Sequence, residues 1–169
     1  MADLKSYKPL RLIAADAEDL QVVSAVLQDA VAKVGDFAHD AGRRRFAFVA
    51  NRFVWECAID RRNGPFARVR AGVHFDDVVA VQQMNVRLDA KDAVVDILAV
   101  AFEAKDDGGG VIMLELAGGG AVRLVVESVN AQISDLTAPW PTGSKPDHGA
   151  AHGAPHGAAD KNVAQTGEG

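Results

Sequence analysis

The sequence predicts an α+β domain, with an N-terminal amphipathic helix packed on a strongly bent or two-layer antiparallel sheet of roughly eight strands. Three observations support this fold class. Apolar residues recur at helical spacing between residues 17 and 30. Apolar and polar residues alternate along several later segments, and turns rich in Asp and Gly separate those segments.

The helix is predicted from Ala17 to about Ala30, after a short apolar strand at Leu10–Ala14. Asp16 suits the N-cap position, because its side-chain oxygen can accept a hydrogen bond from a backbone N–H of the first turn. Glu18 and Asp19 place negative charge where the helix dipole favours it. One apolar stripe should face the core: Leu20, Val23, Val26, Leu27, Ala30 and Val31.

The strands are predicted from period-two alternation. The clearest case is Ala67–Phe75, where apolar side chains face one way and polar ones the other. A hairpin is predicted over Val111–Glu127, because Gly118–Gly120 can supply the positive φ that a tight turn needs. Further strands are predicted at 45–49, 53–59, 78–88 and 94–103, with a turn or bulge at Asn51-Arg52 and a turn at 63–65.

Residues 128–136 allow two interpretations: a strand that continues past a bulge, or a short terminal helix. The helical alternative would suit a pleckstrin-homology-like barrel. The predicted organisation is a flexible N-terminus at 1–9, one α+β domain at 10–138 and a disordered tail at 139–169. That tail is rich in Gly, Ala and His, so it buries too little apolar surface to offset the entropy cost of ordering.

Composition limits the class of protein. The net charge of −5 disfavours nucleic acid and anionic membranes as partners of the whole molecule. The N-terminus lacks a signal-peptide pattern, and no apolar run reaches the roughly 20 residues of a membrane span. A single cysteine, Cys57, rules out an intrachain disulfide, and a small buried strand residue is its favoured role. We therefore expect a cytoplasmic protein.

The strongest charge feature is an arginine-rich segment over residues 43–70. It holds eight arginines and two acidic residues, a net charge of +6. Arginine suits forked contacts to phosphate or carboxylate. The candidate anion-binding or partner-binding residues are Arg44, Arg52, Arg68, Arg70 and Trp55. The alternative is that these arginines pair with the chain's own acids at solvated positions. No RNA-binding motif accompanies them, so nucleic acid is not the favoured ligand.

Histidines give weaker signals. His148, His152 and His156 recur every four residues and could share a metal ion, but glycines and Pro155 prevent the helix that would align them. A solvated tail is favoured over a metal site. His39 is isolated, as is His74. No catalytic motif is present, so no cofactor is predicted, and an enzyme with one of these histidines as base is the weakest hypothesis.

Two segments resemble a known family: Asp19–Asp36 (DLQVVSAVLQDAVAKVGD) and Arg44–Glu56 (RRFAFVANRFVWE). They are similar to a domain-of-unknown-function family of alphaproteobacteria, and the resemblance covers about Leu10 to Trp140. It implies a gene often placed beside those for UDP-N-acetylglucosamine enolpyruvyl transferase and histidinol dehydrogenase, and no activity or catalytic residue.

Two functions remain open on the sequence. The favoured one is a non-enzymatic accessory or regulatory domain that binds a protein partner, because a well-patterned core comes without a catalytic constellation. The alternative is an arginine-lined module that binds a phosphorylated metabolite or RNA. The sequence leaves the oligomeric state open.

Overall fold

The computed structural model describes residues 4, 7–57, 66–143 and 145–146, and every structural statement below concerns these residues. Of the described residues, 52% lie in antiparallel strands, and these residues contain one α-helix. The predicted α+β class is therefore wrong, and the fold is mainly β. The elements are β1 (Arg11–Ala14), α1 (Ala17–Leu27), β2 (Val31–Lys33), β3 (Ala38–Asp40), β4 (Arg45–Phe53), β5 (Phe66–Phe75), β6 (Val78–Met84), β7 (Val94–Ala104), β8 (Gly110–Leu116), β9 (Ala121–Val126), β10 (Ala131–Asp135) and β11 (Trp140–Thr142).

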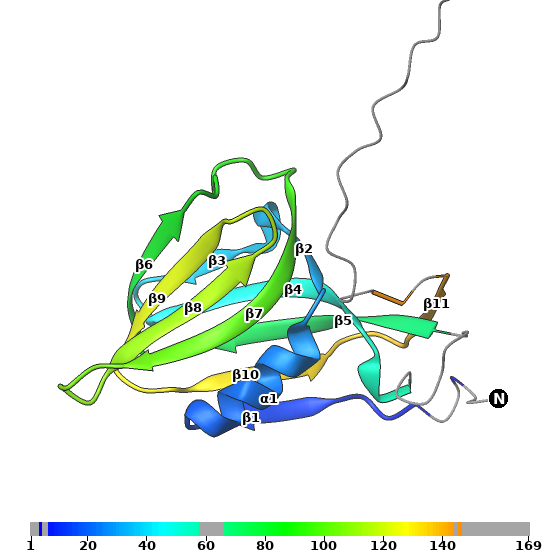
Figure 1. Cartoon of the computed structure of the whole chain (residues 1–169), viewed down its shortest axis with the longest axis horizontal. Helices are drawn as coiled ribbons and strands as arrows, with labels where there is room; N and C mark the ends of the chain where they lie inside the picture. The colour runs from blue at the N-terminus through cyan, green and yellow to red at the C-terminus, as the bar shows by residue number, and fades with distance from the viewer. Residues whose placement is uncertain (1–3, 5–6, 58–65, 144, 147–169) are drawn as a thin grey trace, which may run out of the picture.

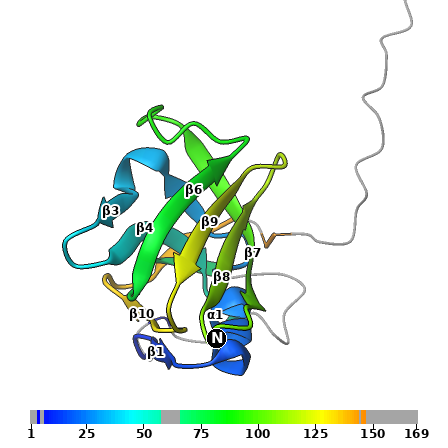
Figure 2. The same ribbon diagram turned by 90° about the vertical axis from the view of Figure 1, so that its left-hand side faces the viewer.

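The strands form one continuous sheet in the order β1-β10-β5-β4-β2-β7-β8-β9-β6, with β11 added to β5 and β3 added to β4. This sheet folds over on itself into two layers whose strands run in different directions (Figures 1 and 2). The first layer contains β1, β10, β5 and β4, and the second contains β7, β8, β9 and β6. β2 joins them, because it pairs with β4 on one side and β7 on the other.

The main core lies between the two layers. Phe46, Phe48 and Val73 project from the first layer, and Ile112 and Leu124 project from the second, all of them buried. Burying a side chain of this size contributes roughly 1.5–3 kcal/mol relative to leaving it exposed. The strand alternation seen in the sequence therefore gives each layer its apolar inner face.

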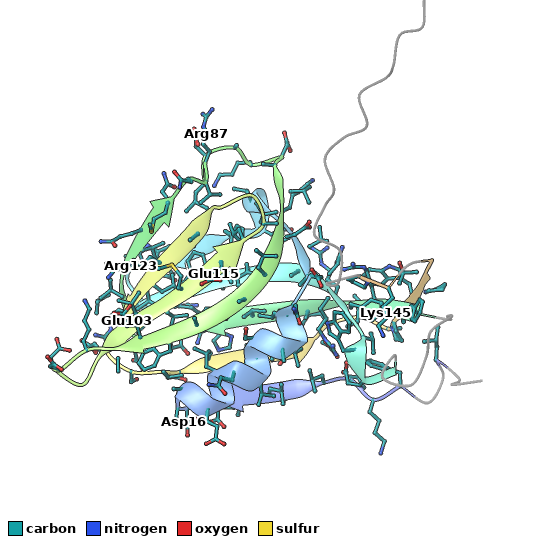
Figure 3. The ribbon with its side chains drawn as sticks, in the orientation of Figure 1. Asp16, Arg87, Glu103, Glu115, Arg123 and Lys145 are labelled. Carbon is teal, nitrogen blue, oxygen red and sulfur yellow. The ribbon has the colours of Figure 1, made fainter. Side chains whose placement is uncertain are left out.

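α1 covers the opening between β7 and β1, in front of the core (Figure 1). The helix is confirmed, although it ends at Leu27 rather than near Ala30. Asp16 caps its start (Figure 3), accepting a hydrogen bond from the Asp19 N–H at 2.8 Å. Ser24 fastens the helix to the sheet, since its Oγ accepts from the Val100 N–H at 2.8 Å.

Two local predictions are confirmed in detail. β5 alternates as expected, with five apolar side chains buried from Ala67 to Phe75. The β8–β9 hairpin turns at Gly118 and Gly119, whose φ angles are +87° and +88°. Such angles favour glycine, because other residues meet steric strain there.

Other local predictions are wrong. Asn51-Arg52 forms neither turn nor bulge, because β4 runs through them to Phe53. The strand predicted at 53–59 is replaced over Trp55–Cys57 by a 3-10 turn, η3. The turn predicted at 63–65 lies outside the described residues. Residues 131–135 form a strand, so the pleckstrin-homology-like alternative lacks its terminal helix.

Segments beyond the predicted domain limits of 10 and 138 also contact the sheet. β11 pairs with β5 opposite Phe66–Arg68, and Tyr7 donates a hydrogen bond to Asp135. None of the described helices has both the length and the apolar content needed to cross a membrane.

Candidate functional site

A hollow surface lies on the outer face of the first layer. Two adjoining hollows, of about 340 and 300 Å³, share Asp36 and Val49 in their linings, and we call the two together the outer groove. It is lined by Val31, Lys33, Asp36, Ala38, Ala47, Val49, Asn51, Arg70, Gly72, His74, Ser134, Leu136 and Val94, among others.

Strand register produces the floor of this groove. Outward positions of β10, β5 and β4 fall side by side, because Ser134 pairs with Gly72 and Gly72 pairs with Val49. The side chains at these three positions are small, so the outer surface of the sheet is recessed there. Leu136 forms one wall and is 58% exposed; its Cδ1 lies 3.3 Å from the point where a Cβ on Gly72 would stand. The missing side chain at Gly72 thus makes room for Leu136.

One half of the groove is polar. Lys33, Asp36, Asn51 and Arg70 line it, together with the exposed Val94. The Arg70 guanidinium lies 3.6 Å from an Asp36 carboxylate oxygen, and both side chains are partly exposed. The Asn51 Oδ1 atom is buried and has no hydrogen-bond partner among the described residues. This half therefore offers charged groups and an unsatisfied acceptor within one hollow.

The other half is mainly apolar, with Leu136 and His74 at its edge. Burial lowers the pKa of His74, and the positive charge of Arg45 lowers it further, while Asp76 opposes both effects. Asp76 is itself held by Arg45 through bonds of 2.6 and 3.1 Å. His74 is therefore mostly neutral near pH 7 and adds a weakly polar edge.

The four arginines singled out by the sequence do not converge. Arg44 lies just before β4 and pairs with Glu127 at 2.9 Å, whereas Arg52 lies near the other end of β4, about 23 Å from its first residue. Arg68 and Arg70 share the outer face of β5, as predicted. Arg68, however, donates to the backbone carbonyls of Asp29 and Asn51. Arg70 is thus the member of the set that lines the groove.

Arg52 points inward, into an ionic cluster formed by Arg52, Asp135, Glu56 and Tyr7. Its side chain has no exposed surface, and it bonds both oxygens of Asp135, at 2.8 and 2.9 Å, and both of Glu56, at 3.0 and 2.8 Å. The Tyr7 hydroxyl and the Leu10 N–H also donate to Asp135. This guanidinium is fully engaged inside the protein and cannot reach an external ligand.

The pKa directions in the cluster follow from these contacts. Burial alone would lower the pKa of Arg52, but the hydrogen bonds that Arg52 donates to the Asp135 and Glu56 carboxylates outweigh burial and raise it. Burial alone would raise the pKa of Asp135, but hydrogen bonds from Arg52, Tyr7 and the Leu10 N–H hold it below its usual range. Desolvation, with the bond to Asp135, raises the pKa of Tyr7.

The other candidates lie apart from the groove. Trp55 is half-buried against Phe53, and its indole N–H donates to the Gln28 carbonyl at 3.2 Å. His39 is exposed on β3. The tail histidines His148, His152 and His156 lie outside the described residues, and within the described part no three side chains suited to metal binding come together.

Most of the groove has no recognisable signal in the sequence. Ala47, Val49, Gly72 and Leu136 carry no chemical motif, and their proximity depends on the pairing of β4, β5 and β10. One signal was present: Gly72 interrupts the outward positions of an otherwise regular strand, which can mark a close approach of another group.

A family model for DUF2948, described as a protein of unknown function, matches residues 10–148. The chain belongs to the DUF2948 family. This agrees with the resemblance seen in the sequence, which pointed to a domain of unknown function over nearly the same range. Neither the curated proteins nor the solved structures gave a match to this chain.

Proposed function

We propose that this DUF2948 protein is a non-enzymatic accessory or regulatory domain that binds an extended segment of a protein partner in the outer groove. The observation that supports it is that the two hollows adjoin, since Asp36 and Val49 line both, so that a polar half lies beside an apolar half. A binding surface that combines exposed apolar side chains with a polar rim is typical of protein recognition.

The dimensions support an extended occupant. The groove crosses β10, β5, β4, β2 and β7. Neighbouring strands lie about 4.8 Å apart, so these five span about 19 Å, the length of about six extended residues. Its floor is shallow and carries small side chains, which suits a peptide lying flat better than a small molecule that needs enclosure. A cytoplasmic setting, favoured by the lone cysteine, is part of the proposal.

A displayed library of random 12-residue peptides tests this function. Peptides selected on the wild-type protein should bind at least tenfold more weakly to Val49→Arg, because the long side chain fills the junction of the two hollows. Val125→Arg is the matched control, since Val125 is also a half-buried outward valine, next to last in β9, and lines a separate hollow on the second layer. Circular dichroism verifies that both variants fold.

The result that would refute the proposal is equal binding of the selected peptides to Val49→Arg and Val125→Arg, or the absence of any peptide whose binding depends on Val49. Purification from the native host with the same two variants extends the test to whole proteins. A partner that contacts the groove should be retained by Val125→Arg and lost from Val49→Arg.

A further inference from the structure

We infer that the segment bound in the outer groove carries an acidic side chain beside an apolar one, with the carboxylate at Lys33 and Arg70 and the apolar group against Leu136. This inference rests on the proposed function and names the chemistry of the partner. Two features support the inference: the charge and exposure of the polar half of the groove, and the position of the apolar half next to it.

The polar half has an excess of positive charge. Lys33 and Arg70 line it against one carboxylate, that of Asp36. Lys33 is exposed on β2, and the Arg70 side chain keeps 45% of its surface exposed. The protein as a whole has a net charge of −5, so the local positive charge is opposite in sign to the net charge of the molecule. Such a spot favours an acidic group on the partner.

Arg70 has donors to spare. Its contact with Asp36 is 3.6 Å long, beyond hydrogen-bond length, and partly exposed ion pairs of this kind contribute little. A guanidinium can bind a carboxylate through two parallel N–H donors, which is a stronger arrangement than the one it has with Asp36. An incoming carboxylate can therefore compete for Arg70 without disrupting the fold.

A lone carboxylate would bind weakly at such an exposed site, so the ligand needs a second point of contact. Leu136 provides it: its backbone N–H bonds to the Arg70 carbonyl at 2.7 Å, which places the apolar wall beside the polar half. A peptide with an acidic residue next to an aliphatic or aromatic one matches this pairing. A polynucleotide does not, because Arg44, Arg52 and Arg68 are directed elsewhere or already bonded.

The test compares peptide selections on three proteins. Peptides selected on the wild type should be enriched in Asp or Glu adjacent to an apolar residue. A double variant with Lys33→Glu and Arg70→Glu should instead select Lys or Arg at that position. Arg123→Glu, which reverses an arginine on the outer face of the second layer, should retain the acidic preference. All three proteins are checked for folding by circular dichroism.

Binding constants give a second readout on one selected acidic peptide. Arg70→Gln should weaken its binding about three- to fivefold, as expected for one partly exposed ion pair, and Arg123→Gln should leave it unchanged. The wild-type affinity should also fall as salt is raised. The inference is overturned if Val49-dependent peptides show no acidic enrichment, or if charge reversal does not alter the selection; loss of Val49 dependence itself overturns the proposed function.

Discussion

The ionic cluster around Arg52 makes the sharpest prediction about stability. We expect Asp135→Asn to destabilise the protein strongly, because asparagine has the same shape but cannot neutralise Arg52. The variant loses charge-assisted bonds of 2.8 and 2.9 Å to a guanidinium that has no exposed surface. Its amide also presents a donor where Tyr7 and Leu10 donate.

The magnitude follows from the burial. Removing one partner of a buried ion pair costs about 3–5 kcal/mol, and because Glu56 remains bonded to Arg52 we expect the lower end, about 3 kcal/mol. With a denaturant slope of about 2 kcal/mol/M, the urea midpoint should fall by about 1.5 M. The assay is urea unfolding at pH 7, followed by tryptophan fluorescence and circular dichroism.

An exposed pair provides the control. Asp89 binds Arg87 at 2.8 Å, but these side chains are 70% and 80% exposed, and Arg87 lies on an outer loop (Figure 3). Asp89→Asn should leave the midpoint unchanged. An unchanged midpoint in Asp135→Asn would refute the reasoning. If that variant fails to fold, the double variant Arg52→Met with Asp135→Leu should recover folding, because it removes both buried charges together.

The pH dependence has a definite sign. The pKa of Asp135 is lower in the folded protein than in the unfolded chain, where an aspartate has a pKa of about 3.9. Its contribution is therefore fully present above that unfolded value and is lost as the pH falls through the folded value. The stability gap between wild type and Asp135→Asn should be constant from pH 5 to 7 and should narrow below about pH 4.

Two further predictions concern other parts of the fold. Folding raises the pKa of Tyr7. The contribution of Tyr7 to the free energy of unfolding is therefore fully present below its unfolded pKa of about 10 and is lost as the pH rises through the folded value. A series of urea midpoints measured at increasing pH should show a smaller alkaline loss of stability in Tyr7→Phe than in the wild type. Gly110→Ala should lower the melting temperature sharply, because its Cβ would lie 2.5 Å from the Glu103 carbonyl oxygen. Gly118→Ala has open space at its Cβ, so its stability should fall only by the strain of a positive φ.

The sequence was most informative where structure depends on neighbours in the chain. The Asp16 cap, the alternation of β5 and the Gly118 turn are each set by residues a few positions apart, and each is confirmed. The fold class was wrong because short strands carry almost no periodic signal. β2, β3 and β11 have three residues each, and their pairing with longer strands defines them.

Arg52 shows why the length of β4 escaped prediction. Asn51-Arg52, which lies between two apolar runs, was interpreted as a turn or bulge, whereas Arg52 occupies an inward position of one continuous strand. The strand continues because Asp135, 83 residues later, neutralises Arg52 inside the protein. No local pattern reveals such a partner. The same limit applies to the groove, whose floor depends on residues from three strands that are far apart in sequence.

The buried cluster and the outer groove are linked through the end of β10. Asp135 bonds Arg52 on the inner side of the first layer, and the next residue, Leu136, forms the groove wall over Gly72 on the outer side. Leu136 directly follows the last residue of β10, and its backbone N–H bonds the Arg70 carbonyl at 2.7 Å, so the charge pair that holds Asp135 also restricts the position of Leu136. Buried Arg52 then does more than stabilise the fold, because through Asp135 it helps to position Leu136, the apolar wall that a bound peptide would contact. Evolutionary selection that preserves the outer groove would therefore also act on Arg52, although that side chain is fully buried.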